Sequence, residues 1–213
     1  LTNNNILAAN YPFATIEPNT GVVPVPDERL EKLAAIYGSS KILPATVTFV
    51  DIAGLVAGAS KGEGLGNKFL SNIRQCDAII HIVRAFVNND IVHVSNKVDP
   101  KEDIEVINTE LIIADVQTIE NRIQKLAKEA KSKPSIRSDI EYLNKLVTHL
   151  NSGALLSLIT DLDHDLISDL HLLTAKPVIY AFNVDEDTLT DIDQQKQLSG
   201  LVSPAQSIFV SAK

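Results

Sequence analysis

The sequence predicts an α/β fold in which a mostly parallel sheet is interrupted by an inserted antiparallel α-helical coiled-coil hairpin. Short apolar segments typical of strands recur along the chain, at 46–50, 78–83, 177–182 and 207–210. The runs at 78–83 and 177–182 are typical of buried strands, and the first of these is expected to be buried on both faces of a parallel sheet. Between these two runs, apolar residues recur at alternating intervals of four and three, which is typical of coiled-coil helices. Five of the nine glycines fall within residues 46–70, directly after the first strand. Ligands bind at the carboxyl ends of strands in open α/β sheets, so this loop marks a candidate site.

Composition places the chain among globular proteins. Its 213 residues are 45% apolar, enough for one large domain or two small ones, and no run of about 18 apolar residues predicts a membrane span. The net charge of −8 argues against broad electrostatic binding to nucleic acid and against sequence-specific DNA binding, although a local basic patch remains compatible with it. The single cysteine, Cys76, excludes an internal disulfide and fits a cytoplasmic location.

The first 45 residues predict loops around one edge strand and one helix. Residues 10–21 contain two prolines and little periodicity, which favours a loop. Residues 22–25 predict a strand that its prolines restrict to a sheet edge. Asp27 then caps a helix that Gly38 ends, with Leu30, Leu33, Ala34 and Tyr37 on one face.

The strand at 46–50 ends in Asp51, which opens the D-x-x-G sequence Asp51-Ile52-Ala53-Gly54. In nucleotide hydrolases this turn brings a carboxylate to Mg²⁺ through water and a glycine amide to the terminal phosphate. The pattern is common by chance, and its position between a strand and a glycine-rich loop makes it informative. A helix is expected over 67–74.

Two histidines follow. His81 lies within the predicted strand 78–83, where a packed core histidine is favoured over a catalytic one. His93 lies in the polar loop 86–100, where the residues alone favour an ordinary surface histidine.

From Glu102 the sequence predicts two helices joined by a tight connection at 131–135, and therefore an antiparallel hairpin. Its polar outer face is either solvated or a partner contact. Further helix is expected over 154–173. The two apolar seams consist of Ile112, Val116, Ile119, Ile123, Leu126 and Ala130, and of Ile136, Ile140, Leu143, Val147 and Leu150.

The strand at 177–182 runs directly into Asn183-Val184-Asp185-Glu186. Two interpretations are open: a base-recognition loop, or a capped turn after a strand. The last strand, 207–210, is followed by Ser211-Ala212-Lys213.

Several of these segments resemble one family. The run DIAGLVAGASKGEGLGNKFL at 51–70 is similar to the switch II segment of Obg-related P-loop NTPases, and NYPFATIEPNTG at 10–21 is similar to switch I of their YchF, or Obg-like ATPase, branch. The resemblance spans nearly the whole chain, continuing through HIVRAF, DIVHV, KVDP, DIEVINTEL, LLTAKPV and NVDE.

The resemblance implies a P-loop NTPase core at 1–100 and 174–213, with the coiled-coil insert at 101–173. Family members carry a strand and a Walker A loop before the point that corresponds to Leu1, and a TGS domain after the last residue. The Walker A pattern G-x-x-x-x-G-K-[ST] does not occur in these 213 residues. We therefore expect a fragment, unstable on its own, of a longer protein. A full-length protein that truly lacks the motif would be a non-hydrolysing interaction module.

The family pattern also implies site roles. Thr15 and Asp51 would serve Mg²⁺, and Gly54 the γ-phosphate. Leu55 stands where many related GTPases have a glutamine that orients the attacking water, and leucine cannot hydrogen-bond that water. In this branch His93 is the candidate for that task.

The base-recognition loop departs from the N-K-x-D pattern of GTPases. Val184 stands at the lysine position and Glu186 at the aspartate position, whose carboxylate accepts hydrogen bonds from guanine. Adenine lacks both of those donors, so a preference for ATP is predicted. A GTPase or an enzyme indifferent to the base is the alternative, and the ribosome is the partner that the resemblance implies. The residues expected to contact the base are Asn183, Val184, Glu186, Ser211, Ala212 and Lys213.

Overall fold

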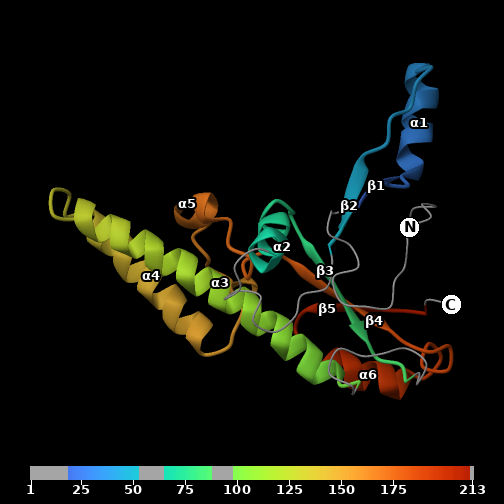
Figure 1. The fold of residues 1–213 in the computed structure, drawn as a ribbon. Helices are drawn as coiled ribbons and strands as arrows, with labels where there is room; N and C mark the ends of the chain where they lie inside the picture. Colours follow the sequence, from blue (N-terminus) through green and yellow to red (C-terminus); the bar gives the residue numbers. More distant parts are fainter. Residues whose placement is uncertain (1–18, 53–64, 88–97, 212–213) are drawn as a thin grey trace. The chain divides into compact units, whose positions relative to one another are not determined.

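The computed structural model describes residues 19–52, 65–87 and 98–211, which belong to two compact units divided after Gly54. In the first unit, strands β1 (Asn19–Pro24) and β2 (Thr46–Asp51) pair antiparallel in a two-stranded sheet, with Asn19 opposite Asp51 (Figure 1). The predicted strand that ends in Asp51 is confirmed. Within the described residues, its partner is this antiparallel neighbour.

Helix α1 (Glu28–Tyr37) follows β1 and precedes β2 in the chain, and it begins and ends as predicted. The Asp27 carboxylate accepts a hydrogen bond from the Arg29 backbone amide at 3.0 Å, and Gly38 adopts a left-handed φ of 62°. The predicted apolar face is not covered, because Leu33 is 50% exposed and no residue of the helix is buried.

The second unit contains a three-stranded parallel sheet with the order β3-β4-β5. It confirms the three later predicted strands to within one residue. Helix α2 (Leu65–Arg74) precedes the sheet in the chain. Because the strands are parallel, their carboxyl ends meet at one edge of the sheet. The strands span Ile79–Arg84 (β3), Val178–Asn183 (β4) and Gln206–Val210 (β5).

One face of this sheet is packed. Val83, Tyr180 and Phe182 form a cluster there with Ile104 of α3 and with residues in and after α6 (Ile192–Gly200). On the other face, Ile82 is 69% exposed. The prediction that β3 is buried on both faces is therefore wrong in the described part of the chain, because α3 and α6 contribute to the same cluster.

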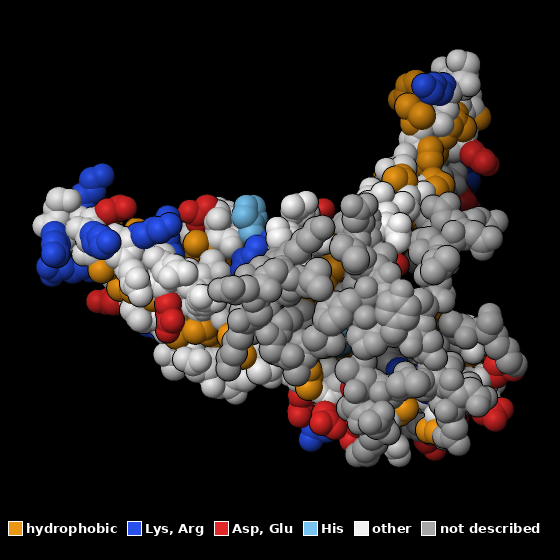
Figure 2. All heavy atoms as spheres, viewed as in Figure 1, with side chains coloured by type: hydrophobic (Ala, Val, Ile, Leu, Met, Phe, Trp, Pro, Cys, Tyr) orange, Lys and Arg blue, Asp and Glu red, His pale blue; other side chains and the backbone are white. Residues whose placement is uncertain are grey.

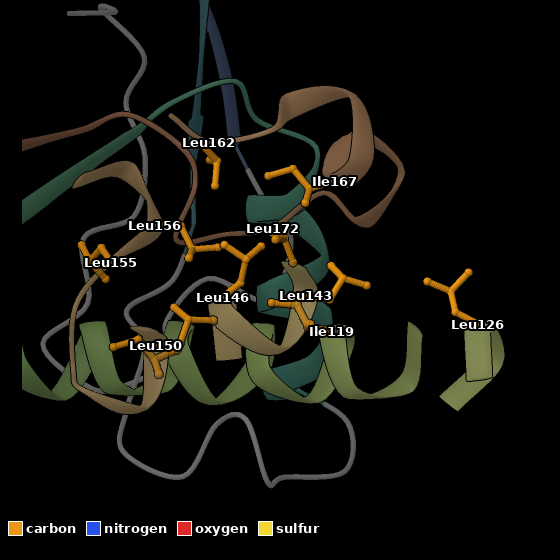
Figure 3. Packing of buried hydrophobic residues seen from close by; sticks show 11 residues of the cluster. Ile119, Leu126, Leu143, Leu146, Leu150, Leu155, Leu156, Leu162, Ile167 and Leu172 are labelled. Atoms are coloured by element: carbon orange, nitrogen blue, oxygen red, sulfur yellow. The ribbon is translucent and has the colours of Figure 1, made fainter. Parts of the chain in front are cut away.

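The inserted hairpin is confirmed. Helices α3 (Pro100–Glu129) and α4 (Ile136–Asn151) pack along their length, and every predicted seam residue except Ala130, which follows α3, enters one apolar core (Figures 1 and 3). Helix α3 begins two residues before the predicted Glu102, because Asp99 caps it, accepting a hydrogen bond from the Glu102 amide at 3.3 Å. At 1.5 Å per residue its 30 residues span about 45 Å. None of the described helices is long and apolar enough to cross a membrane.

The segment after the hairpin differs from the prediction. Instead of a helix over 154–173, it forms three short helical segments. These are the 3-10 helices Leu156–Leu158 and Ser168–Leu170 and the four-residue α-helix α5 (His164–Ile167). Aspartate and serine residues interrupt it, and Asp163 caps α5 by accepting from the Leu166 amide. Its apolar residues still pack against the hairpin (Figure 3): Leu155, Leu156, Leu162, Ile167 and Leu172.

Candidate functional site

The carboxyl edge of the parallel sheet brings two predicted base-contacting positions together. Asn183 ends β4, opposite Val210, and Ser211 directly follows β5. Two backbone hydrogen bonds join the three strands there: the Ala85 amide donates to the Asn183 carbonyl at 2.8 Å, and the Val184 amide to the Val210 carbonyl at 2.9 Å. This is the edge at which open α/β sheets bind ligands.

The turn after β4 divides its side chains between packing, capping and exposure. Val184 is 2% exposed, so its side chain belongs to the sheet core. Asp185 accepts two hydrogen bonds from Thr188, from the hydroxyl at 2.7 Å and from the amide at 2.9 Å, and these bonds lower the pKa of Asp185. Glu186 is exposed. The capped turn is therefore present, and Asp185 makes it. The predicted contact between Glu186 and the base is a separate hypothesis.

Arg84 is a further charged residue at this edge, opposite Asn183. Its Nε donates to the Phe86 carbonyl at 3.2 Å, and its guanidinium lies 4.6 Å from the centre of the Phe86 ring. Sequence reasoning did not select it. The available signal was a cation that ends an apolar strand at the ligand-binding edge.

A partly buried polar network joins α2, α3 and the segment before β4. Arg74, the last residue of α2, donates to the carbonyls of Leu170 and His171 at 3.2 and 3.1 Å, and to the Thr118 hydroxyl of α3 at 3.0 Å. The Lys176 ammonium donates to the carbonyls of Arg74 and Cys76. The network therefore fixes the end of the helix that follows the glycine-rich loop to the hairpin.

Asp115 of α3 is the buried acid of this network. Its carboxylate is completely buried and accepts from the Leu173 amide at 2.9 Å and from the amide and hydroxyl of Thr174, both at 2.7 Å. Burial raises the pKa of Asp115, while those hydrogen bonds and the Arg74 guanidinium at 4.0 Å oppose the shift. Sequence reasoning missed this residue, since it appears only as a polar position between two seam residues.

The predicted magnesium ligands are only partly described. Asp51 ends β2 in the first unit and is exposed. Carboxylate and hydroxyl oxygens suit Mg²⁺, which keeps several waters and takes few protein ligands. The described ranges contain no group of three or more His, Cys, Asp or Glu residues able to hold a metal. The other predicted positions, Thr15, Gly54, His93, Ala212 and Lys213, lie outside the described residues.

Comparison with known proteins decides the family. Residues 1–137 match the profile of a family described as "50S ribosome-binding GTPase". Proteins named "Ribosome-binding ATPase YchF" are 53% identical over 205 residues in Haemophilus ducreyi, 52% over 187 in Bacillus subtilis and 50% over 213 in Escherichia coli O157:H7. The chain belongs to the YchF family. These alignments cover 93%, 86% and 99% of this chain.

A solved YchF structure has the same fold. The chain matches "Structure of the Schizosaccharomyces pombe YchF GTPase" with a TM-score of 0.70 and 38% identity, over 95% of this chain and 58% of that one. The chain also covers only 56%, 51% and 59% of the three bacterial relatives. It thus spans little more than half the length of the YchF proteins that it matches.

Proposed function

We propose that the protein to which this chain belongs is a Mg²⁺-dependent nucleotide hydrolase that prefers ATP to GTP and acts as a nucleotide-state switch on the ribosome. The observation that carries the proposal is the Asn183–Glu186 turn beside Ser211, at the carboxyl edge of a parallel sheet, in a chain 50% or more identical to proteins named ribosome-binding ATPases. ATP, Mg²⁺ and the ribosome are thus the proposed ligands and partner.

Each proposed role follows from the chemistry of its residue. Thr15 and Asp51 would hold Mg²⁺, which neutralises charge on the phosphates when bound. The Gly54 amide would donate to the γ-phosphate, and His93 would orient the attacking water in place of the glutamine that Leu55 replaces. Switch segments that contact the γ-phosphate change order on hydrolysis and so report the nucleotide to a partner.

The preference for ATP rests on Glu186. A carboxylate placed to read guanine would leave its acceptors unpaired against adenine, and the longer glutamate side chain moves the carboxylate away from that position. The neighbouring Asp185 has another part in this turn, because its Oδ1 accepts both the amide and the hydroxyl hydrogen bonds from Thr188.

The test is competition of ATP and GTP for a fluorescent nucleotide on the full-length protein. We expect ATP to compete better, and Glu186→Asp to move the ratio of the two affinities toward GTP by roughly tenfold. The exposed Glu141 of α4 supplies the control variant, Glu141→Asp. Equal competition, or an unchanged ratio in Glu186→Asp, would refute the assignment and favour a base-indifferent enzyme or the GTPase that the fission-yeast title names.

The role of His93 is tested separately by phosphate release. We expect His93→Ala to lower turnover by about 100-fold with unchanged nucleotide affinity, since only placement of the water is lost. His164→Ala, at an exposed position on α5, is the control. Unchanged turnover in His93→Ala would remove His93 from the mechanism.

A further inference from the structure

The end of the helical hairpin carries a charge opposite to that of the rest of the chain. The 16 residues from Arg122 to Arg137 include six of the 19 Lys and Arg residues and one of the 27 Asp and Glu residues. This stretch therefore has a net charge of +5, while the other residues together carry −13. Figure 2 shows these blue side chains gathered where α3 and α4 join.

Five of these cations, which we call the tip cations, are available to a partner. All five are exposed, and within the described part of the chain no salt bridge involves any of them. Arg122, by contrast, pairs with Asp169 at 3.1 Å. The tip cations are Lys125, Lys128, Lys131, Lys133 and Arg137.

Stability does not explain the cluster. Neighbouring like charges on a helix destabilise it slightly, and Lys125 and Lys128 lie three residues apart on one side of α3. The apolar seam beneath them already holds the hairpin together. Lys128 lies 24 residues, or about 36 Å, along α3 from Ile104, which packs in the sheet core, so the tip cations contribute nothing to that core.

The surface of the hairpin favours a phosphate backbone over a protein as its partner. Protein interfaces are built on apolar and aromatic anchors and are depleted in lysine. No large apolar side chain of the hairpin, which the structure describes throughout, is among the exposed ones. Contacts to nucleic-acid phosphates need only exposed lysine and arginine side chains.

We propose that the tip cations bind the phosphate backbone of RNA in the ribosome. The proposal rests on the proposed function for the presence of a ribosome and adds the contacting surface and the chemistry that it recognises. Such contacts carry no sequence information, so the tip would position the protein by backbone charge and shape.

The experiment compares three forms of the full-length protein. The tip variant is Lys128→Glu/Lys131→Glu/Lys133→Glu, and the control is Lys32→Glu/Lys41→Glu/Lys196→Glu, which changes the charge equally at exposed lysines elsewhere. Binding is measured to isolated large ribosomal subunits by co-sedimentation and to deproteinised ribosomal RNA by filter binding, at salt concentrations from about 50 to 200 mM. Basal ATP hydrolysis is measured for all three.

We expect the tip variant to bind large ribosomal subunits, and also ribosomal RNA, at least tenfold more weakly than the wild type does. The slope of log K against log salt concentration should fall in magnitude by about two to three. The control should bind as the wild type does, and basal hydrolysis should be equal in all three forms.

Three outcomes overturn the proposal. In the first, the tip variant binds RNA as tightly as the control. In the second, it loses subunit binding but keeps RNA binding, which would identify an acidic ribosomal protein as the partner. In the third, the wild type does not bind RNA. A wild type that binds RNA through the tip but hydrolyses no ATP would instead contradict the proposed function alone.

Discussion

At the scale of single residues, Asp115 is a fully buried carboxylate held by three hydrogen bonds. It is completely buried in α3 and satisfies three donors from Leu173 and Thr174, which belong to the segment that leads into β4. Removing one partner of such an arrangement leaves buried donors without acceptors, which costs far more than a surface substitution.

We therefore expect Asp115→Ala to lower the free energy of unfolding by about 3–5 kcal/mol. Chemical denaturation of the full-length protein measures this. Glu141→Ala, at an exposed position of α4, should change it by less than about 0.5 kcal/mol. Equal effects of the two substitutions would show that the three hydrogen bonds do not stabilise the fold.

His81 is a partly buried ionisable residue, and it makes stability depend on pH. It lies on β3 with its ring 5.4 Å from that of Tyr180, and burial lowers the pKa of His81 to about 4. The unfolded chain protonates this histidine near pH 6.5, whereas the folded protein does not until about pH 4. Stability is therefore lost as the pH falls through this window.

We expect the wild type to lose up to about 3 kcal/mol of unfolding free energy between pH 6.5 and 4 through His81, a loss that His81→Leu should not show. Denaturant titrations at several pH values measure the difference between the two proteins. Replacement of the exposed His164 by alanine should leave the pH dependence unchanged. A constant difference between wild type and His81→Leu across the window would contradict the assignment.

At the scale of secondary-structure elements, Arg74 holds three of them together. Its planar guanidinium reaches the Leu170 and His171 carbonyls in one direction and the Thr118 hydroxyl of α3 in another. Lysine cannot reproduce this fork, because its ammonium is a single point of donation. The end of α2 is thereby coupled to the hairpin.

Arg74→Lys should lower the free energy of unfolding by about 1–3 kcal/mol and speed amide exchange in residues 168–176. Hydrogen exchange read by mass spectrometry resolves the segment. Arg122→Lys is the matched control, since its ion pair with Asp169 is largely exposed and should contribute less than about 1 kcal/mol. Exchange that rises equally in both variants would mean that Arg74 does not fix this segment.

The elements also show where sequence patterns suffice. Apolar runs bounded by polar residues located β3, β4 and β5, and the four-three spacing located both hairpin seams. The same reasoning failed for 154–173, because apolar residues spaced like a helix pack there as an irregular segment. Helix α6 was missed because it is polar and signalled only by its Asp191 cap.

At the scale of the whole molecule, the family resemblance assigned Asn183 and Ser211 to one base-binding site, and the fold brings both positions to the carboxyl edge of one parallel sheet. The network of Asp115 and Arg74 was not predictable, since its hydrogen bonds join residues that lie between 44 and 102 positions apart in the sequence. Contacts over such separations leave no local pattern.

Ligand binding should stabilise the full-length protein as a whole. We expect ATP with Mg²⁺, at about 100 times its dissociation constant, to raise the free energy of unfolding by about 2.7 kcal/mol, and chelation of Mg²⁺ with EDTA to remove most of that gain. Thermal unfolding with ATP, GTP or neither, with and without EDTA, measures it. An equal gain with EDTA present would argue against metal ligands at Thr15 and Asp51.

The position of the hairpin in the chain also has a consequence for folding. Ile79 of β3 pairs with Val178 of β4, so the chain must close a loop of nearly 100 residues to form this sheet. Contacts between α3 and α4 span much shorter separations, and both helices precede β4 in the chain and are therefore synthesised before it. We expect the hairpin to form first and to shorten the search by which the two strands find each other.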